Sequence, residues 1–172
     1  MSAETKSKNP MRRPKLEKVT VNMGVGESGK NLSNAEMLIK TLTNQKPVKT
    51  IARKTIFGVR KGEPIGCFVT LRKKAAEDFL VRALKVVGNR IHEGSFDKMG
   101  NFSFGIEDHT EFGIKYDPDV GIFGMDVCVS LARPGYRIAR RKIASHKIPK
   151  SHRLTKEDSI SFVREKYGVS VE

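Results

Sequence analysis

The chain has 172 residues and a formal net charge of +14, a length that suits one domain with its own hydrophobic core. It has no run of eighteen apolar residues, so no transmembrane helix is expected, and the strong positive charge favours a polyanionic partner.

The charge is unevenly distributed along the chain. Residues 31–74 hold ten bases and two acids, and residues 128–154 hold eight bases and no acid, whereas residues 75–127 have a net charge of −5. We therefore expect one basic face and one acidic face. The alternative is a basic soluble protein without a specific polyanionic partner.

The first thirteen residues are polar and basic and lack the apolar stretch of a signal peptide. They are predicted to form a flexible tail that orders on a partner. Cys67 and Cys128 both fall in strand patterns and are expected to be reduced, as in a cytoplasmic protein. The four histidines have no metal-ligand spacing, so no metal site is predicted.

Residues 16–23 alternate as a half-buried strand does, with Val19, Val21 and Met23 facing one way. Its other face carries Lys18, Thr20 and Asn22.

The next segment, residues 24–31, reads GVGESGKN and has the glycine spacings of nucleotide-binding loops. However, Asn31 stands where a magnesium-binding Ser or Thr is needed, and residues 49–53 lack the acid expected in a dinucleotide fold. A nucleotide-binding enzyme is therefore the minor alternative to a glycine-rich structural turn.

Helical patterns follow at several points. The capping box Ser33–Glu36 predicts a helix start there, and an apolar stripe predicts a second helix from about residue 75 to Ile91. Arg133–Lys142 is expected to begin a basic helix, with Pro134 in its first turn, and a second capping box at Thr155–Asp158 to begin the last helix.

Residues 45–74 join two strand patterns through a basic, glycine-rich loop at 58–66. The second strand is expected to bury Cys67, Val69 and Leu71 and to present Phe68, Thr70 and Arg72 outward. An aromatic ring, a hydroxyl and a guanidinium on one sheet face suit RNA.

Phe96, Phe102 and Phe104 are expected to join the core, with partner contacts as the alternative. The clustered carboxylates between Glu107 and Asp119 could indicate general acid–base chemistry or a metal site. Their spacing favours a solvated acidic face instead. Residues 125–131 form a further strand pattern.

Four segments resemble the ribosomal protein L5 family of the large subunit. They are PKLEKVTVNMGVGES (14–28), NQKPVKTIARKTIFGVRKGEPIGCFVTLR (44–72), SFDKMGNFSFGIEDH (95–109) and GMDVCVSLA (124–132). The resemblance implies an α+β fold in which helices cover one face of an antiparallel sheet and the other face binds RNA. It also implies a non-enzymatic, cytoplasmic, ribosome-bound protein without a cofactor, which anchors 5S rRNA to the large rRNA in the central protuberance.

The resemblance also implies particular contacts. The family's polar trio for 5S rRNA corresponds to Asn22, Gln45 and Thr70, and the loop Arg60–Pro64 (Arg60, Lys61, Gly62, Glu63, Pro64) corresponds to a segment that approaches peptidyl-site tRNA. Region 95–125 corresponds to one that approaches a small-subunit head protein. Around the trio, the predicted 5S rRNA contact also includes Lys18, Thr20, Lys46, Lys49, Arg53, Phe68 and Arg72.

The termini depart from the bacterial members, because residues 133–172 extend beyond the last strand as in the archaeal and eukaryotic branch. We expect a tail at 1–13, one RNA-binding domain at 14–132 and a helical extension at 133–172 packed on it. In the predicted basic helix at 133–147, the residues expected to contact rRNA phosphates are Arg133, Arg137, Arg140, Arg141, Lys142 and Lys147. A general RNA chaperone and a nucleotide-binding enzyme are the rival functions.

Overall fold

A computed structural model of the chain describes residues 9–55 and 58–172. Its centre is a five-stranded sheet in the order β2-β3-β1-β6-β5, in which every neighbouring pair is antiparallel. The strands are β1 (Lys15–Gly24), β2 (Val48–Ile51), β3 (Pro64–Leu71), β5 (Phe102–Ile106) and β6 (Met125–Ala132). The predicted α+β class is confirmed.

The alternation of apolar and polar residues decides which face of each central strand is buried. Val19, Val21 and Met23 of β1 are fully buried, while Thr20 and Asn22 between them are partly exposed. In β3, Cys67, Val69 and Leu71 are likewise buried. The sheet therefore has one core face and one open face, as the alternation predicted.

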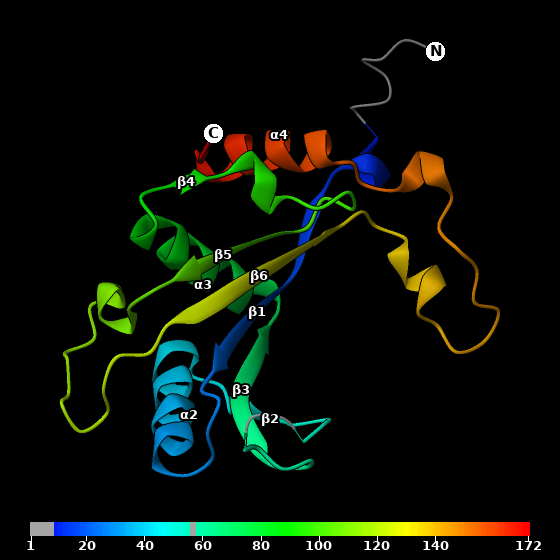
Figure 1. Ribbon diagram of the computed structural model, residues 1–172. Coiled ribbons are helices and arrows are strands. Elements are labelled where there is room, and N and C mark those ends of the chain that lie inside the picture. The colour runs from blue at the N-terminus through cyan, green and yellow to red at the C-terminus, as the bar shows by residue number, and fades with distance from the viewer. Residues whose placement is uncertain (1–8, 56–57) are drawn as a thin grey trace.

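Helices α2 (Lys30–Thr43) and α3 (Lys73–Val86) pack on the core face of the sheet (Figure 1). Each presents an apolar stripe at helical spacing, including Leu38 and Ile39 of α2 and Phe79 and Leu80 of α3. Burying side chains of this size contributes about 1.5–3 kcal/mol each. These two helices cover the core face of the sheet and leave its other face open.

Two predicted helix boundaries were wrong. α2 begins at Lys30 rather than Ser33, because Gly29 with φ +110° breaks the extended backbone and caps the helix, and the Ser33 hydroxyl donates back to the Gly29 carbonyl. α3 ends at Val86 rather than near Ile91. Asn89, with φ +55°, turns the chain, and the buried Ile91 belongs to the short strand β4 (Arg90–Ile91).

The predicted basic helix at 133–147 is also wrong. This segment contains only the single turn η4 (Tyr136–Ala139), and Gly135 and Ala144 both have positive φ. Its exposed arginines and lysines leave no apolar stripe that could pack a helix against the core. The remaining single turns are η1 (Pro10–Arg12), η2 (Glu93–Ser95), η3 (His109–Phe112) and η5 (Lys150–His152).

The last helix, α4 (Lys156–Tyr167), begins with the predicted capping box, in which Thr155 and Asp158 exchange hydrogen bonds. Val163 of α4 is fully buried, and Leu154 before the helix and Val169 after it join the same core as the sheet. The chain then pairs β7 (Ser170–Val171) in parallel with β4. The C-terminal residues thus share one hydrophobic core with the rest of the described chain.

The structure also places the predicted core aromatics and the two cysteines. Phe96 and Phe102 are buried and their ring centroids lie 5.0 Å apart, so these aromatics are core residues. Cys67 and Cys128 are both free thiols. None of the helices in the described part of the chain is long and apolar enough to cross a membrane.

Candidate nucleic-acid interface

The open face of the sheet places polar and aromatic side chains next to each other across β1 and β3. Thr20 lies opposite Thr70 and Asn22 lies opposite Phe68 in the antiparallel register. All four side chains are partly exposed. Directly opposite residues on one face have Cβ atoms about 4.5–5.5 Å apart, so these four form one contiguous surface.

The register extends this surface into two rows across the sheet. One row runs Val48, Phe68, Asn22, Asp126 and Gly105, from β2 to β5. The neighbouring row contains Thr70, Thr20, Cys128 and Ser103. The rows combine hydroxyl, amide, carboxylate and aromatic groups, which is a surface suited to reading unpaired bases.

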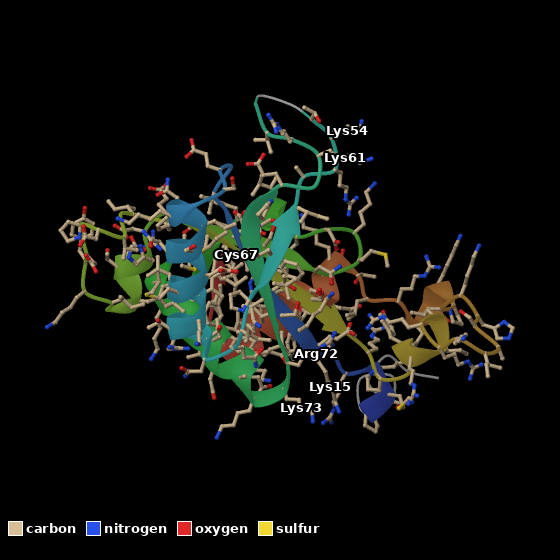
Figure 2. All side chains as sticks on the ribbon, turned by 90° about the horizontal axis from the view of Figure 1, so that it is seen from below. Lys15, Lys54, Lys61, Cys67, Arg72 and Lys73 are labelled. Carbon is tan, nitrogen blue, oxygen red and sulfur yellow. The ribbon has the colours of Figure 1, made fainter. Side chains whose placement is uncertain are left out.

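Basic side chains border this surface at the end where β1 begins. Lys18 precedes Val19, which pairs with Leu71, and Arg72 follows Leu71, so both bases lie at the same end of the sheet. Arg72 and its chain neighbour Lys73 are exposed, and Figure 2 shows them at the same side of the view as Lys15. Their charges can neutralise phosphates flanking a base bound on the open face.

Gln45 and Lys46 are exposed in the turn between α2 and β2. The left-handed conformation of Asn44, with φ +53°, ends the helix and reverses the chain. β2 then begins at Val48, opposite Phe68. The turn thus enters the sheet beside the strand that carries Phe68 and Thr70.

Two predicted contact residues are not brought together with the trio. Lys49 pairs in register with the buried Cys67, so it projects toward the helix side, where its Nζ lies 3.4 Å from a carboxylate oxygen of Glu36. Arg53 lies beyond the end of β2, toward the loop.

The loop between β2 and β3 projects from the sheet with Lys54 and Lys61 near its tip (Figure 2). Glu63 organises it: its carboxylate accepts hydrogen bonds from the Ser28 hydroxyl at 2.5 Å and from the Arg60 amide at 2.9 Å. These bonds lower the pKa of the Glu63 carboxyl. Arg60, Lys61 and Gly62 remain exposed. Pro64 already belongs to β3, and residues 56–57 lie outside the described residues.

The glycine-rich segment after β1 is a structural turn. The amides of Val25 and Gly26 donate to the Ile65 carbonyl at 3.1 and 2.8 Å, and the Ser28 hydroxyl is bonded to Glu63. Two loop amides and one hydroxyl that could contact a phosphate in a nucleotide-binding loop are therefore engaged within the fold. The antiparallel sheet also differs from the parallel sheets that carry such loops.

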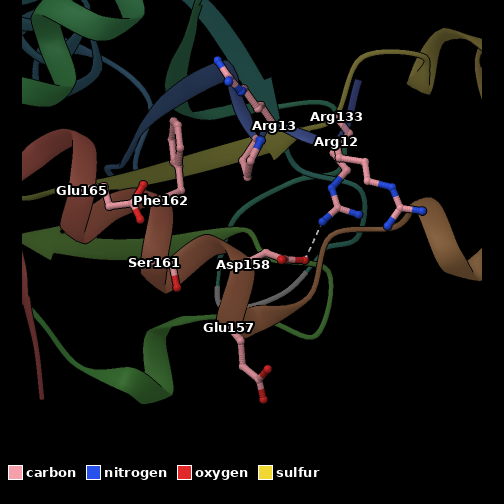
Figure 3. A pocket seen from close by; sticks show the side chains of 9 residues that line it. Arg12, Arg13, Arg133, Glu157, Asp158, Ser161, Phe162 and Glu165 are labelled. Carbon is pink, nitrogen blue, oxygen red and sulfur yellow. Dashed lines mark hydrogen bonds and ion pairs between the residues drawn. The ribbon is translucent and has the colours of Figure 1, made fainter. Parts of the chain in front are cut away.

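Two arginines of the basic segment 133–147 form ion pairs with acidic residues that are distant in the sequence. Arg133 donates to Asp158 at 2.8 Å and to the Arg153 carbonyl at 3.1 Å, and its side chain is only 10% exposed (Figure 3). Arg140 donates twice to the carboxylate of Glu17. The hydrogen bonds from Arg140 lower the pKa of Glu17 and raise that of Arg140 itself.

The other four bases of this segment remain accessible to a partner. Arg137, Arg141, Lys142 and Lys147 are all exposed. The Nε of Arg141 donates to the Ala144 carbonyl at 2.8 Å, which shapes the turn that follows. Two of the six predicted phosphate contacts are thus tied into the fold, and four are free to meet RNA.

Carboxylates of the acidic stretch are used in local turns. Asp108 caps η3 by accepting from the Thr110 amide, which lowers its pKa, and Asp117 accepts from the Asp119 amide. No cluster of three potential metal ligands occurs within the described residues. Most of these carboxylates are solvent-exposed, as the sequence predicted.

The sequence analysis did not assign Val48, Ser103, Asp126 or Cys128 to the open face. The alternation of β6 contained the necessary information, because residues between the buried Met125, Val127 and Val129 must face the other way. The alternation of apolar and polar residues could not show, however, that β6 pairs with β1 in the sheet.

Comparison with known proteins identifies the family. Residues 9–60 match ribosomal protein L5, and residues 64–162 match the C-terminus of the same ribosomal family. The large ribosomal subunit protein uL5 of Methanococcoides burtonii is 56% identical over 95% of this chain and 99% of its own length. That of Sulfurisphaera tokodaii is 54% identical over 98% of each chain. The chain therefore belongs to the ribosomal protein L5 family, in its archaeal-type branch.

Proposed function

We propose that this protein binds 5S rRNA through the open face of its sheet and anchors it to the large rRNA in the large ribosomal subunit. Membership of the family supports the broader role of a structural, non-enzymatic, rRNA-binding protein of that subunit. The proposal adds the RNA and the surface that binds it.

The observation that carries the proposal is the register between β1 and β3. It places Asn22 beside Phe68 and Thr20 beside Thr70 on a face that the helices leave uncovered. Aromatic stacking together with polar groups is how proteins recognise unpaired RNA bases. Lys18 and Arg72 at the rim supply charge for the flanking phosphates.

The exposed bases of 133–147 have a different role in the proposal. Arg137, Arg141, Lys142 and Lys147 lie outside the sheet face and present charge without an aromatic platform. Contacts of this kind position a protein on RNA and carry little sequence information. We assign them to phosphates of the large rRNA.

The proposed role of the β2–β3 loop is to approach peptidyl-site tRNA. Arg60 and Lys61 are exposed, while Glu63 fixes the base of the loop through Ser28 and the Arg60 amide. A loop held in this way can present two cations to a second RNA without disturbing the open face. The region 95–125 is the proposed contact with a small-subunit head protein.

A competition experiment tests the 5S rRNA assignment. Labelled 5S rRNA from Methanococcoides burtonii is bound to the protein at about 0.15 M salt and displaced by unlabelled 5S rRNA or by an unrelated structured RNA of equal length. We expect 5S rRNA to compete roughly 10³-fold better, the low end of specificity ratios known for protein–DNA complexes. Equal competition by both RNAs would instead identify a general RNA chaperone.

A further inference from the structure

Asp126 is the unexplained residue of the open face. It lies in the middle of β6, directly opposite Asn22, and its side chain is exposed. Aspartate is disfavoured in strand interiors. Within residues 9–55 and 58–172, no cation lies within ion-pairing distance of its carboxylate. The fold therefore gains no evident stability from a negative charge at this position.

A carboxylate also weakens binding to RNA phosphates, because its negative charge repels the RNA backbone. Phosphate binding alone therefore does not explain Asp126 on this surface. Asp126 shares this face with Cys128, two residues along the strand, whose thiol pKa is raised by burial and then by the charge of Asp126. On RNA a carboxylate can accept hydrogen bonds from base-edge N–H groups and from ribose 2′-hydroxyls, and only the base edges distinguish one base from another.

The neighbours of Asp126 complete a site for one base. Phe68, Asn22 and Asp126 follow one another in a single row across β3, β1 and β6. With strands about 4.7–4.9 Å apart, the backbones that carry the aromatic ring and the carboxylate lie roughly 10 Å apart. A purine stacked on Phe68 can direct its edge over Asn22 toward Asp126.

The ionised carboxylate decides which base fits, since it has two acceptor oxygens and no donor. The Watson–Crick edge of guanine offers two adjacent donors, N1–H and the N2 amino group, and can pair with both oxygens. Adenine, cytosine and uracil do not present two adjacent donors there. We propose that Phe68, Asn22 and Asp126 form a surface site for one unpaired guanine, with Asp126 as the residue that selects it.

This inference rests on the proposed function and makes a distinctive prediction for Asp126→Asn. The substitution keeps the shape of the side chain but replaces one acceptor by a donor and removes a negative charge. Binding to 5S rRNA should weaken roughly five- to 150-fold, the loss expected for a bidentate base contact. Binding to an unrelated RNA should become slightly stronger, because a repulsive charge is gone. Glu111→Gln is the matched control, since it removes an exposed carboxylate outside the sheet and should not weaken 5S rRNA binding.

The decisive experiment replaces the unpaired guanines of M. burtonii 5S rRNA one at a time by inosine, which lacks only the N2 amino group. One replacement should weaken binding of the natural protein, and the same replacement should have a clearly smaller effect on Asp126→Asn, which keeps only one acceptor oxygen. This scan also tests the contact in the unaltered protein. If 5S rRNA is preferred over unrelated RNA but no inosine position depends on Asp126, the guanine site is refuted and the proposed function stands. If 5S rRNA is not preferred at all, the proposed function itself fails.

Discussion

Arg140 donates two hydrogen bonds to the carboxylate of Glu17 and so ties the segment after β6 to the start of β1. Glu17 occupies the irregularity between Leu16 and Lys18 where the β1–β6 register shifts. Its side chain is 18% exposed and that of Arg140 is 58% exposed. One acid on a basic surface thus holds the irregular segment 133–147 close to the sheet.

The ion pair between Glu17 and Arg140 is expected to stabilise the folded protein in a pH-dependent way. The hydrogen bond from Arg140 lowers the folded-state pKa of Glu17, so the contribution is complete above the unfolded-state pKa of about 4.3 and is lost as the pH falls through the folded-state value. Because Arg140 is largely exposed, Glu17→Gln should cost only about 0.2–1 kcal/mol at pH 7.

Urea denaturation at pH 7 and at pH 3 checks this expectation. The difference between the natural protein and Glu17→Gln should shrink at the lower pH. Arg140→Gln should have a similar cost at pH 7, and the double variant should cost little more than either single change. Additive costs would show that the two side chains contribute independently.

The polar trio gives a second prediction. Asn22→Ala, Gln45→Ala and Thr70→Ala should each weaken 5S rRNA binding by about 1–3 kcal/mol, because each leaves a buried RNA group without its partner. Ser161→Ala is the control, since Ser161 is exposed on helix α4, outside the open face of the sheet. Binding is measured by titration and folding by thermal melting. Unchanged affinity in all three variants with normal melting would remove the trio from the site.

The loop gives a third prediction, in which its exposed charges are changed and its hydrogen bonds are kept. Arg60→Gln with Lys61→Gln leaves the contacts of the Glu63 carboxylate with Ser28 and the Arg60 amide in place. We expect 5S rRNA affinity to stay nearly constant and tRNA occupancy of assembled ribosomes to fall. Lys85→Gln with Arg90→Gln removes the same charge at exposed positions outside the proposed contacts and should leave occupancy normal. Loss of 5S rRNA binding in the loop variant would mean that the two roles overlap.

Local patterns were sufficient for the strands of the open face. The alternation in residues 16–23 and 65–72 correctly separated Thr20, Asn22 and Thr70 from the core, because side-chain period in a strand is fixed by backbone geometry. The same rule was insufficient for Lys49, since three of the four residues of the edge strand β2 are exposed and none is buried. Its orientation follows only from pairing with Cys67.

The partners of the basic segment could not be predicted from local sequence. Glu17 and Arg140 are separated by 123 positions, and Arg133 and Asp158 by 25. Because residues 128–154 contain no acid, the sequence predicted a basic helix whose charges were all available to RNA. In the fold, two of its arginines are neutralised by distant carboxylates, and the positive φ of Gly135 and Ala144 prevents a continuous helix.

A fourth prediction concerns the expected division into a domain at 14–132 and an extension at 133–172. We propose that both unfold together, since Leu154 is buried in the core that also contains Val163 and the sheet. Leu154→Ala should cost about 2–5 kcal/mol and shift a single unfolding transition. Calorimetry measures this directly. A separate low-temperature transition, with the main one unchanged, would show that the extension unfolds independently.

The last prediction distinguishes the exposed bases of 133–147 from Arg140, which is paired with an acid of the same chain. Arg137, Lys142 and Lys147 are exposed, whereas Arg140 is paired with Glu17. If the three exposed bases contact rRNA phosphates, changing all three to Gln should weaken binding to large-rRNA fragments and flatten its salt dependence. The expected change in log–log slope is about 0.7–0.9 per lost contact, if nucleic-acid values from DNA apply.

A salt titration of the natural protein, the triple variant and Arg140→Gln on large-rRNA fragments measures these slopes. Arg140→Gln should change the slope less than the triple variant does per charge removed, because its charge is already balanced by Glu17. An unrelated hairpin should lose affinity by a factor similar to that of rRNA, since phosphate contacts are largely indifferent to sequence. An unchanged slope for the triple variant on every RNA would show that the segment faces solvent or protein, and its role would then be to dock a protein partner.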